Sequence, residues 1–147
     1  RLEMAKERKI ADYYFCLETD GNLKEFVHKI TGGMGPNKVV VANTSKVSAK
    51  QAVEIVAKGG VVQLFAGFPK ESPVLDIDGN LIHYRQLTVS SSYGSTPRQF
   101  QLAEQLLFDG KINGKSLITH HLPLEEINKG FELMKNAEAL KVILTYE

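Results

Sequence analysis

The feature of this sequence that most restricts its fold is an alternation between short apolar runs and amphipathic stretches. Residues 39–42 and 61–66 are apolar runs, and the first is apolar on both faces, as a strand inside a parallel sheet is. An amphipathic stretch with helical spacing lies between them and ends at Gly59-Gly60. Strand and helix in alternation predict an α/β fold with a parallel sheet and right-handed crossovers.

Capping residues indicate where the helices begin. We expect one helix to start at Asn22, with Glu25 completing a capping box, and a second to start at Ser48 with Gln51. A third begins at Thr96-Pro97, with Gln99 three residues after the cap. The residues predicted to form the buried stripe of the second helix are Ala49, Ala52, Val53 and Val56.

The remaining segments complete the pattern. Residues 1–9 have the spacing of a helix, and residues 13–17, 87–92 and 141–146 are predicted strands. Cys16 is expected to be a small core residue of the first of these strands, and His83 to lie in a short polar turn. The last helix follows Pro123, and its expected apolar face consists of Ile127, Phe131 and Met134.

Composition excludes several classes of function. A formal net charge of +1 gives no reason to expect a nucleic acid or a membrane surface as partner, and no apolar run approaches the roughly 18 residues of a membrane span. The single cysteine rules out an internal disulfide and favours a cytoplasmic protein. The first residue is Arg1 rather than Met, which we interpret as a cut end.

Several segments in order resemble the second half of the zinc-dependent medium-chain dehydrogenases, the family of alcohol, sorbitol and threonine dehydrogenases. They are Ile30-Thr31-Gly32-Gly33-Met34-Gly35, the run from Val61 to Lys70, and Ile118-Thr119-His120-His121-Leu122-Pro123. Leu81-Ile82-His83-Tyr84-Arg85 followed by Tyr93-Gly94-Ser95-Thr96-Pro97 is more similar to the polyol (sorbitol/iditol) branch.

The resemblance implies a partial Rossmann-type, doubly wound parallel sheet that lacks its first two strands. Residues 1–115 would be the later part of the NAD(P)-binding domain, and residues 116–147 a return segment towards an absent catalytic domain, with a final strand. Ligands of such sheets bind at the carboxyl ends of the strands. The cofactor-binding residues implied by the resemblance are Asn43, Thr44, Ala66, Gly67, Phe68, Ser92, Tyr93, Gly94 and Lys141.

Each of these groups has an implied role. Asn43 and Thr44 would lie near the adenosine, and residues 66–68 near the nicotinamide, where Gly67 permits close backbone approach. Residues 92–94 would flank the carboxamide, and Lys141 would face the pyrophosphate. For each position the alternative is a turn residue, or for Lys141 a solvated lysine, without a ligand.

The glycine-rich phosphate turn and the carboxylate that holds the ribose would both lie upstream of Arg1 by this resemblance. Gly33-Met34-Gly35 does not replace the turn, because it lacks the third glycine and precedes a strand. This sequence is therefore equally compatible with NAD and with NADP as the cofactor. A catalytic zinc needs three protein ligands, and His120 and His121, being adjacent, would point to opposite faces of a strand, so we expect no metal ligand and no catalytic residue here.

The leading hypothesis is a parent enzyme that transfers hydride from a secondary alcohol or polyol to NAD(P)+ with the help of zinc, of which this chain would be an inactive carboxyl-terminal fragment. One alternative is an assembly module that forms a homo-oligomer through the edge strand at residues 87–92. Another is a truncated nucleotide-binding domain without catalysis. Residues 13–17 would lack their sheet neighbour. They could pair with residues 39–42 or with another chain, or the natural polypeptide could be longer than this sequence and supply the neighbour.

Overall fold

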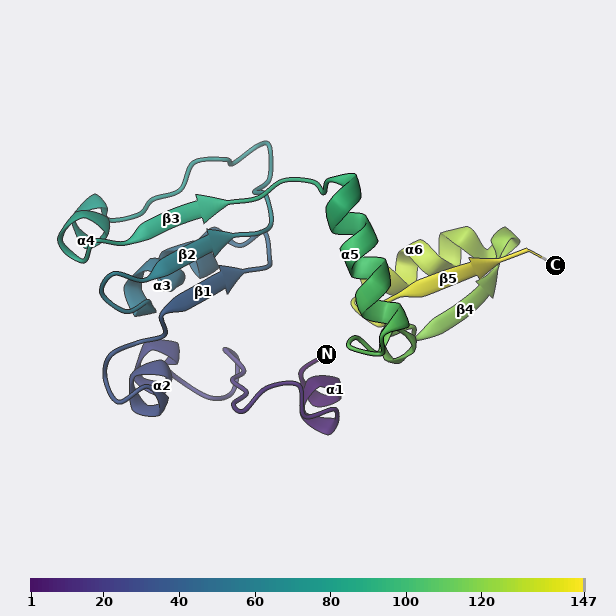
Figure 1. Cartoon of the computed structure of the whole chain (residues 1–147), viewed down its shortest axis with the longest axis horizontal. Coiled ribbons are helices and arrows are strands. Elements are labelled where there is room, and N and C mark those ends of the chain that lie inside the picture. Colours follow the sequence, from purple (N-terminus) through teal and green to yellow (C-terminus); the bar gives the residue numbers. More distant parts are fainter. Residues whose placement is uncertain (147) are drawn as a thin grey trace. The chain divides into compact units, whose positions relative to one another are not determined.

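A computed structural model describes residues 1–146 and contains two compact units, Phe15–Gly94 and a second unit formed by Arg1–Tyr14 with Ser95–Glu147. The helices are α1 (Leu2–Glu7), α2 (Leu23–Ile30), α3 (Lys46–Ile55), α4 (Gly79–Tyr84), α5 (Pro97–Phe108) and α6 (Ile127–Lys135), with 3-10 turns η1 (Gly114–Leu117) and η2 (Leu124–Glu126). The strands are β1 (Lys38–Val41), β2 (Val61–Leu64), β3 (Thr88–Ser91), β4 (His120–Pro123) and β5 (Val142–Thr145), as Figure 1 shows.

The unit Phe15–Gly94 is built on a parallel sheet in the order β1-β2-β3 (Figure 1). Val41, Leu64 and Ser91 are aligned across it in register, so the three strands end together. Helix α3 connects β1 to β2 and packs against both strands. The α/β prediction with a parallel sheet is therefore confirmed.

The core of this unit lies between α3 and one face of the sheet. The predicted helical stripe is confirmed, because Ala49, Ala52, Val53 and Val56 are all at most 2% exposed. From the sheet, Val41 and Val62 pack against these residues, and Val62 is completely buried. Full burial of a valine side chain contributes roughly 1.5–3 kcal/mol, so this apolar layer is the main source of stability of the unit.

The start of α3 differs from the prediction. Ser45, and not Ser48, is the N-cap, and its hydroxyl accepts a hydrogen bond from the backbone N–H of Ser48 at 3.4 Å. Both serines precede the buried stripe at a spacing that suits a cap, and only the earlier one has the extended backbone that a cap needs. At the start of α2 the predicted cap is confirmed, because Asn22 accepts from the backbone of Lys24 and Glu25.

The predicted strand at residues 13–17 is wrong. This segment forms no strand in the structure, and Tyr13 and Leu17 are 59% and 56% exposed. An isolated strand is not stable without a partner that takes up its backbone hydrogen bonds, and none of the described strands pairs with this segment. Phe15 instead packs on Phe26 of α2, with ring centroids 4.8 Å apart.

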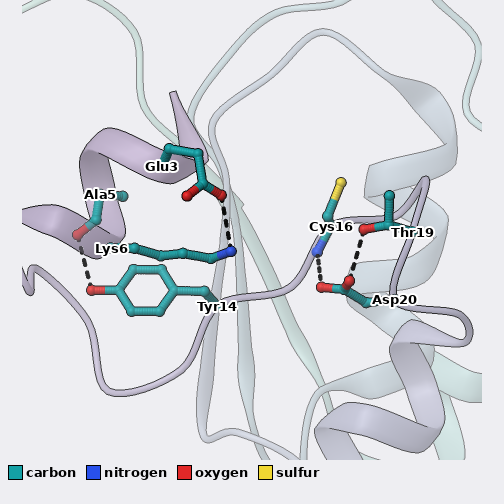
Figure 2. Close-up of polar contacts among 7 residues, drawn as sticks. All are labelled: Glu3, Ala5, Lys6, Tyr14, Cys16, Thr19 and Asp20. Atoms are coloured by element: carbon teal, nitrogen blue, oxygen red, sulfur yellow. Dashed lines mark hydrogen bonds and ion pairs between the residues drawn. The ribbon is translucent and has the colours of Figure 1, made fainter.

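Cys16 is half-buried in a turn rather than being a core residue of a strand. Figure 2 shows the backbone N–H of Cys16 donating to a carboxylate oxygen of Asp20 at 2.8 Å, and the hydroxyl of Thr19 donating to the other oxygen at 2.7 Å. The backbone N–H of Asp20 returns to the carbonyl oxygen of Cys16 at 2.9 Å. The carboxylate of Asp20 therefore closes the turn.

The segment between β2 and β3 was expected to be a loop with His83 in a polar turn, and it contains the short helix α4 instead. Asp78 caps this helix by accepting from the backbone N–H of Asn80 at 2.8 Å. Leu81 and Ile82 pack against the core that α3 and the sheet form. Two apolar residues in a row were too short a pattern to indicate a helical face.

The second unit contains the parallel pair β4–β5, covered by α6. β5 confirms the predicted strand at residues 141–146, whereas β4 was not predicted. In α5 the predicted cap is confirmed, because Thr96 and Gln99 form a reciprocal capping box with Pro97 in the first turn. The face of α6 made by Ile127, Phe131 and Met134 lines an open hollow of about 200 Å³ beside β5. Within residues 1–146, no helix is both long enough and apolar enough to span a membrane.

Candidate functional site

The carboxyl ends of β1, β2 and β3 form one edge of the sheet, because parallel strands in register end on the same side. The residues that follow each strand are therefore brought to a common edge. These are eight of the nine predicted site residues, namely Asn43, Thr44, Ala66, Gly67, Phe68, Ser92, Tyr93 and Gly94.

The turn after β1 is held by hydrogen bonds at both of its sides. Asn43 accepts from the backbone N–H of Ser45 at 2.9 Å, which leads the chain into the cap of α3. The carbonyl oxygen of Val41 accepts from the backbone N–H groups of Phe65 and Ala66 at 3.1 and 3.4 Å. The turn after β2 is thereby fixed to the end of β1, and Asn43 and Thr44 remain exposed to solvent.

Gly67 follows β2 and has an exposed backbone. A Cβ atom built on it would meet no heavy atom of the protein within 4 Å, and its φ is not in the left-handed region. Neither packing inside the chain nor backbone geometry therefore requires glycine here. The missing side chain leaves open space at the strand-end edge, beside the half-buried Ala66 and Phe68.

A row of polar side chains leads to the end of β3. Ser90 donates from its hydroxyl to Oε1 of Gln63 at 2.7 Å, and Nε2 of Gln63 donates to the hydroxyl oxygen of Ser92 at 3.2 Å. Sequence reasoning missed Gln63 and Ser90. The signal that could have found Gln63 is its position as the polar residue of the apolar run at residues 61–66. Tyr93, next to Ser92, projects fully into solvent.

The ninth predicted residue, Lys141, belongs to the other compact unit and precedes β5. Its carbonyl oxygen accepts from the backbone N–H of Thr119 at 3.0 Å, which joins the approaches to β4 and β5. Its exposed side chain lies at the hollow that Phe131 and Met134 also line. Lys141 therefore places a positively charged side chain beside an apolar surface.

The thiol of Cys16 is a group whose titration is clearly shifted. Hydrogen bonding by the side chain of Thr19, followed by the backbone N–H of Glu18, lowers the pKa of the Cys16 thiol below its usual range. The single proton of the Thr19 hydroxyl bonds Asp20 in the structure, so it must turn to the sulfur when the thiolate forms. A lowered pKa alone does not make this thiol a catalytic group.

Comparison with known proteins identifies the family to which this chain is similar. Residues 1–109 match the family model described as zinc-binding dehydrogenase. The chain belongs to the zinc-binding dehydrogenase family.

Two curated relatives in this family match almost the whole chain. A sorbitol dehydrogenase of Halalkalibacterium halodurans is 32% identical over 99% of this chain, and an L-threonine 3-dehydrogenase of Bacillus licheniformis is 31% identical over 98%. The match covers 41% of each relative. This chain therefore spans about two fifths of the length of the dehydrogenases to which it is similar.

Solved structures of the family have the same fold. An alcohol dehydrogenase from Thermotoga maritima superposes with a TM-score of 0.86 at 27% identity, over 99% of this chain and 40% of that one. The alcohol dehydrogenase of Thermus sp. ATN1 gives a TM-score of 0.84 at 26% identity, with 99% and 41% covered. The fold described above is therefore that of the carboxyl-terminal part of a zinc-binding dehydrogenase.

The donor groups of residues 1–146 do not fit the zinc ion that gives the family its description. No three side chains of His, Cys, Asp or Glu in that range come together as ligands. On β4, His120 is half-buried with Nδ1 3.0 Å from the Thr119 hydroxyl, and the adjacent His121 is exposed. The two imidazoles follow one another along a strand and so belong to opposite faces.

Proposed function

We propose that this chain is the carboxyl-terminal part of an NAD(P)-dependent dehydrogenase that oxidises a secondary alcohol, and that it supplies one wall of the cofactor site. The observation that carries the proposal is the common edge at which the residues after β1, β2 and β3 meet. The family match along the chain supports it. We extend the proposal to residues 1–115 as cofactor domain and 116–147 as the return segment.

The chemistry at the reacting carbon would be that of the nicotinamide, which accepts a hydride. The residues of this chain would bind and orient. Asn43 and Thr44 would contact the adenosine, and the open space at Gly67 would admit the nicotinamide side of the cofactor. Ser92, Tyr93 and Gly94 would flank the carboxamide. Lys141 would place a positive charge towards the pyrophosphate.

We propose a polyol as the substrate class, since the relative from Halalkalibacterium halodurans is a sorbitol dehydrogenase and the segments at residues 81–85 and 93–97 resemble that branch. The zinc that lowers the pKa of the alcohol would be held by residues outside this chain. The purified 147-residue chain should then be inactive. We expect the protein itself to be cytoplasmic. Zinc-dependent oxidation of sorbitol by this chain, followed by NADH absorbance, would disprove that part.

Thermal melting tests the cofactor wall directly. A ligand that binds only the folded chain raises its melting temperature, and the rise grows with the logarithm of the ratio of ligand concentration to Kd. We expect millimolar NAD+ or NADH to raise it by a small but reproducible amount, and Gly67→Leu, which fills the open space, to remove the rise without lowering the melting temperature of the free chain. A rise of equal size in the Gly67→Leu variant would contradict the proposed position of the nicotinamide.

A second function, assembly of a homo-oligomer, is favoured by the position of β3 at an edge of the sheet. The backbone N–H of Thr88 bonds Gly60 on the β2 side, so by alternation the N–H of Val89 points to the open edge. Val89 is also 38% exposed. Light scattering should show a dimer that Val89→Pro dissociates, because proline removes an edge donor and leaves the β2 pairing intact. A monomer at high concentration would rule this function out.

A further inference from the structure

The side chains of Gln63, Ser90 and Ser92 form a hydrogen-bonded row on the face of the sheet opposite α3. Gln63 and Ser90 are cross-strand partners in β2 and β3, and Ser92 lies two residues beyond Ser90, on the same face. Their neighbours Val62 and Leu64 point the other way, into the core. The row therefore takes no part in the apolar packing of the unit.

The two distances define the direction of the row. The contact of 2.7 Å between Ser90 and Gln63 is typical of O–H···O, and the contact of 3.2 Å between Gln63 and Ser92 is within the range of N–H···O. Ser90 thus donates to the amide oxygen of Gln63, and the amide nitrogen donates to Ser92. Because the oxygen of Ser92 accepts this bond, its own proton remains available to donate elsewhere.

We propose that Gln63 is a positioning residue that makes the hydroxyl of Ser92 a hydrogen-bond donor to an acceptor oxygen of the ligand at the strand-end edge. Ser92 is exposed at that edge, whereas Gln63 and Ser90 are half-buried behind it. This inference rests on the proposed cofactor wall, and the acceptor is then the carboxamide oxygen of the nicotinamide. The hydroxyl of Ser92, oriented by the row, is then the hydrogen-bond donor to that carboxamide oxygen.

The row itself can be tested without a ligand. In ¹H–¹⁵N NMR spectra of the 147-residue chain, the two Nε2 protons of Gln63 should be well separated and exchange slowly. Ser92→Ala should shift them, and Ser91→Ala, the matched change of the neighbouring hydroxyl on the other face, should not. Side-chain signals of Gln63 at the positions of a free glutamine amide, unchanged by Ser92→Ala, would overturn the row whatever the cofactor does.

The donor role is tested by titrating the chain and its variants with NAD+, followed by chemical shifts. Ser92→Ala should weaken binding by about two- to tenfold, as loss of one neutral hydrogen bond does. Gln63→Glu should weaken it similarly, because a carboxylate accepts from both serines and uses the Ser92 proton. With the thionicotinamide analogue of NAD+, whose sulfur is a weaker acceptor, both losses should shrink, which a merely structural defect would not produce.

The outcomes separate this inference from the proposed function. If NAD+ shifts the signals of Asn43 and Gly67 while Ser92→Ala and Gln63→Glu bind as tightly as the parent chain, the cofactor wall stands and the donor role is overturned. If NAD+ at several millimolar shifts no signal of the edge in the parent chain, the cofactor wall fails, and the donor role towards the carboxamide fails with it. If Ser92→Ala and Gln63→Glu weaken the binding of NAD+ and of its thionicotinamide analogue equally, the row is only a structural contact, and the donor role is also overturned.

Discussion

The guanidinium of Arg85 donates to the carbonyl oxygen of Val56, the C-cap residue that directly follows α3. Its other terminal nitrogen reaches the carbonyl oxygens of Glu54 and Val53 at 3.1 and 3.4 Å. The last carbonyl groups of a helix have no partner inside the helix, and a cation is favourable beside them. A residue that follows α4 therefore completes the end of α3, about 30 positions earlier in the chain.

We expect Arg85→Ala to destabilise the unit Phe15–Gly94 by about 1.5–3 kcal/mol, the usual range for hydrogen bonds to a charged group. Arg85→Lys should recover only part of this, since one ammonium cannot reproduce the planar fork. Urea unfolding followed by circular dichroism measures both changes. A loss below about 0.5 kcal/mol for Arg85→Ala would show that water replaces the guanidinium at the helix end.

Gly35 is required by close backbone approach. A Cβ atom on this residue would lie 2.3 Å from the carbonyl oxygen of Ile55, and its φ of +80° is one that other residues rarely adopt. Gly35→Ala should therefore cost about 2–5 kcal/mol, from steric overlap and backbone strain together. Gly59→Ala is the matched control, because its φ is +73° and its Cβ would meet nothing within 4 Å. Its cost should be about 1 kcal/mol, and equal costs would mean that the contact with Ile55 is relieved by a small shift.

The two faces of the sheet should respond differently to the same substitution. Val62 on β2 is completely buried, and Val40 on β1 is 61% exposed. Val62→Ala should lower the free energy of unfolding by about 2–3 kcal/mol, through lost burial and a residual cavity. Val40→Ala should lower it by less than about 1 kcal/mol, mostly through β-propensity. The denaturant midpoints of the two variants measure this difference, provided that the slope of the unfolding free energy against denaturant concentration is the same in both. A larger loss of unfolding free energy for Val40→Ala than for Val62→Ala would show that the face of Val40 is covered in solution.

The titration of Cys16 gives a prediction on pH. Because Thr19 lowers the pKa of this thiol, the thiolate should form at a lower pH in the folded chain than in urea. The rate of alkylation by iodoacetamide against pH should accordingly have its midpoint at lower pH when the chain is folded. Thr19→Val should move that midpoint upwards, towards the ordinary thiol value. Identical profiles in the folded chain and in urea would exclude the hydrogen bond to the thiolate.

The strands of the sheet and their common edge could be predicted because each depends on a local pattern repeated along the chain. The apolar runs at residues 39–42 and 61–66 needed no knowledge of distant contacts. β2 lies within the second run, and β1 overlaps the first but begins one residue earlier, at Lys38. Once the strands are parallel, the meeting of Asn43, Gly67 and Ser92 at one edge follows from geometry. Whether these residues bind the cofactor remains a prediction.

The predictions that were wrong or missing concern features whose structure depends on a partner far away in the sequence. The run at residues 13–17 has the composition of a strand but no neighbour in the described sheet, and a strand needs that neighbour. β4 contains two histidines and a proline, and its pairing with β5 provides an order that its composition does not indicate. The row through Gln63 was missed because its hydroxyl partners, Ser90 and Ser92, lie 27 and 29 residues away.

The order β1-β2-β3 has a consequence for synthesis on the ribosome. Strand order equals chain order, so β2 and β3 each emerge when the strand beside which they lie has already been made. The unit Phe15–Gly94 can thus grow in the direction of translation. The second unit differs, because the Arg1 guanidinium bonds the carbonyl oxygen of Ala139 at 3.4 Å, so this contact of helix α1 must wait until Ala139 has been made. Helix α1 would then settle later than the unit Phe15–Gly94, although it precedes that unit in the sequence.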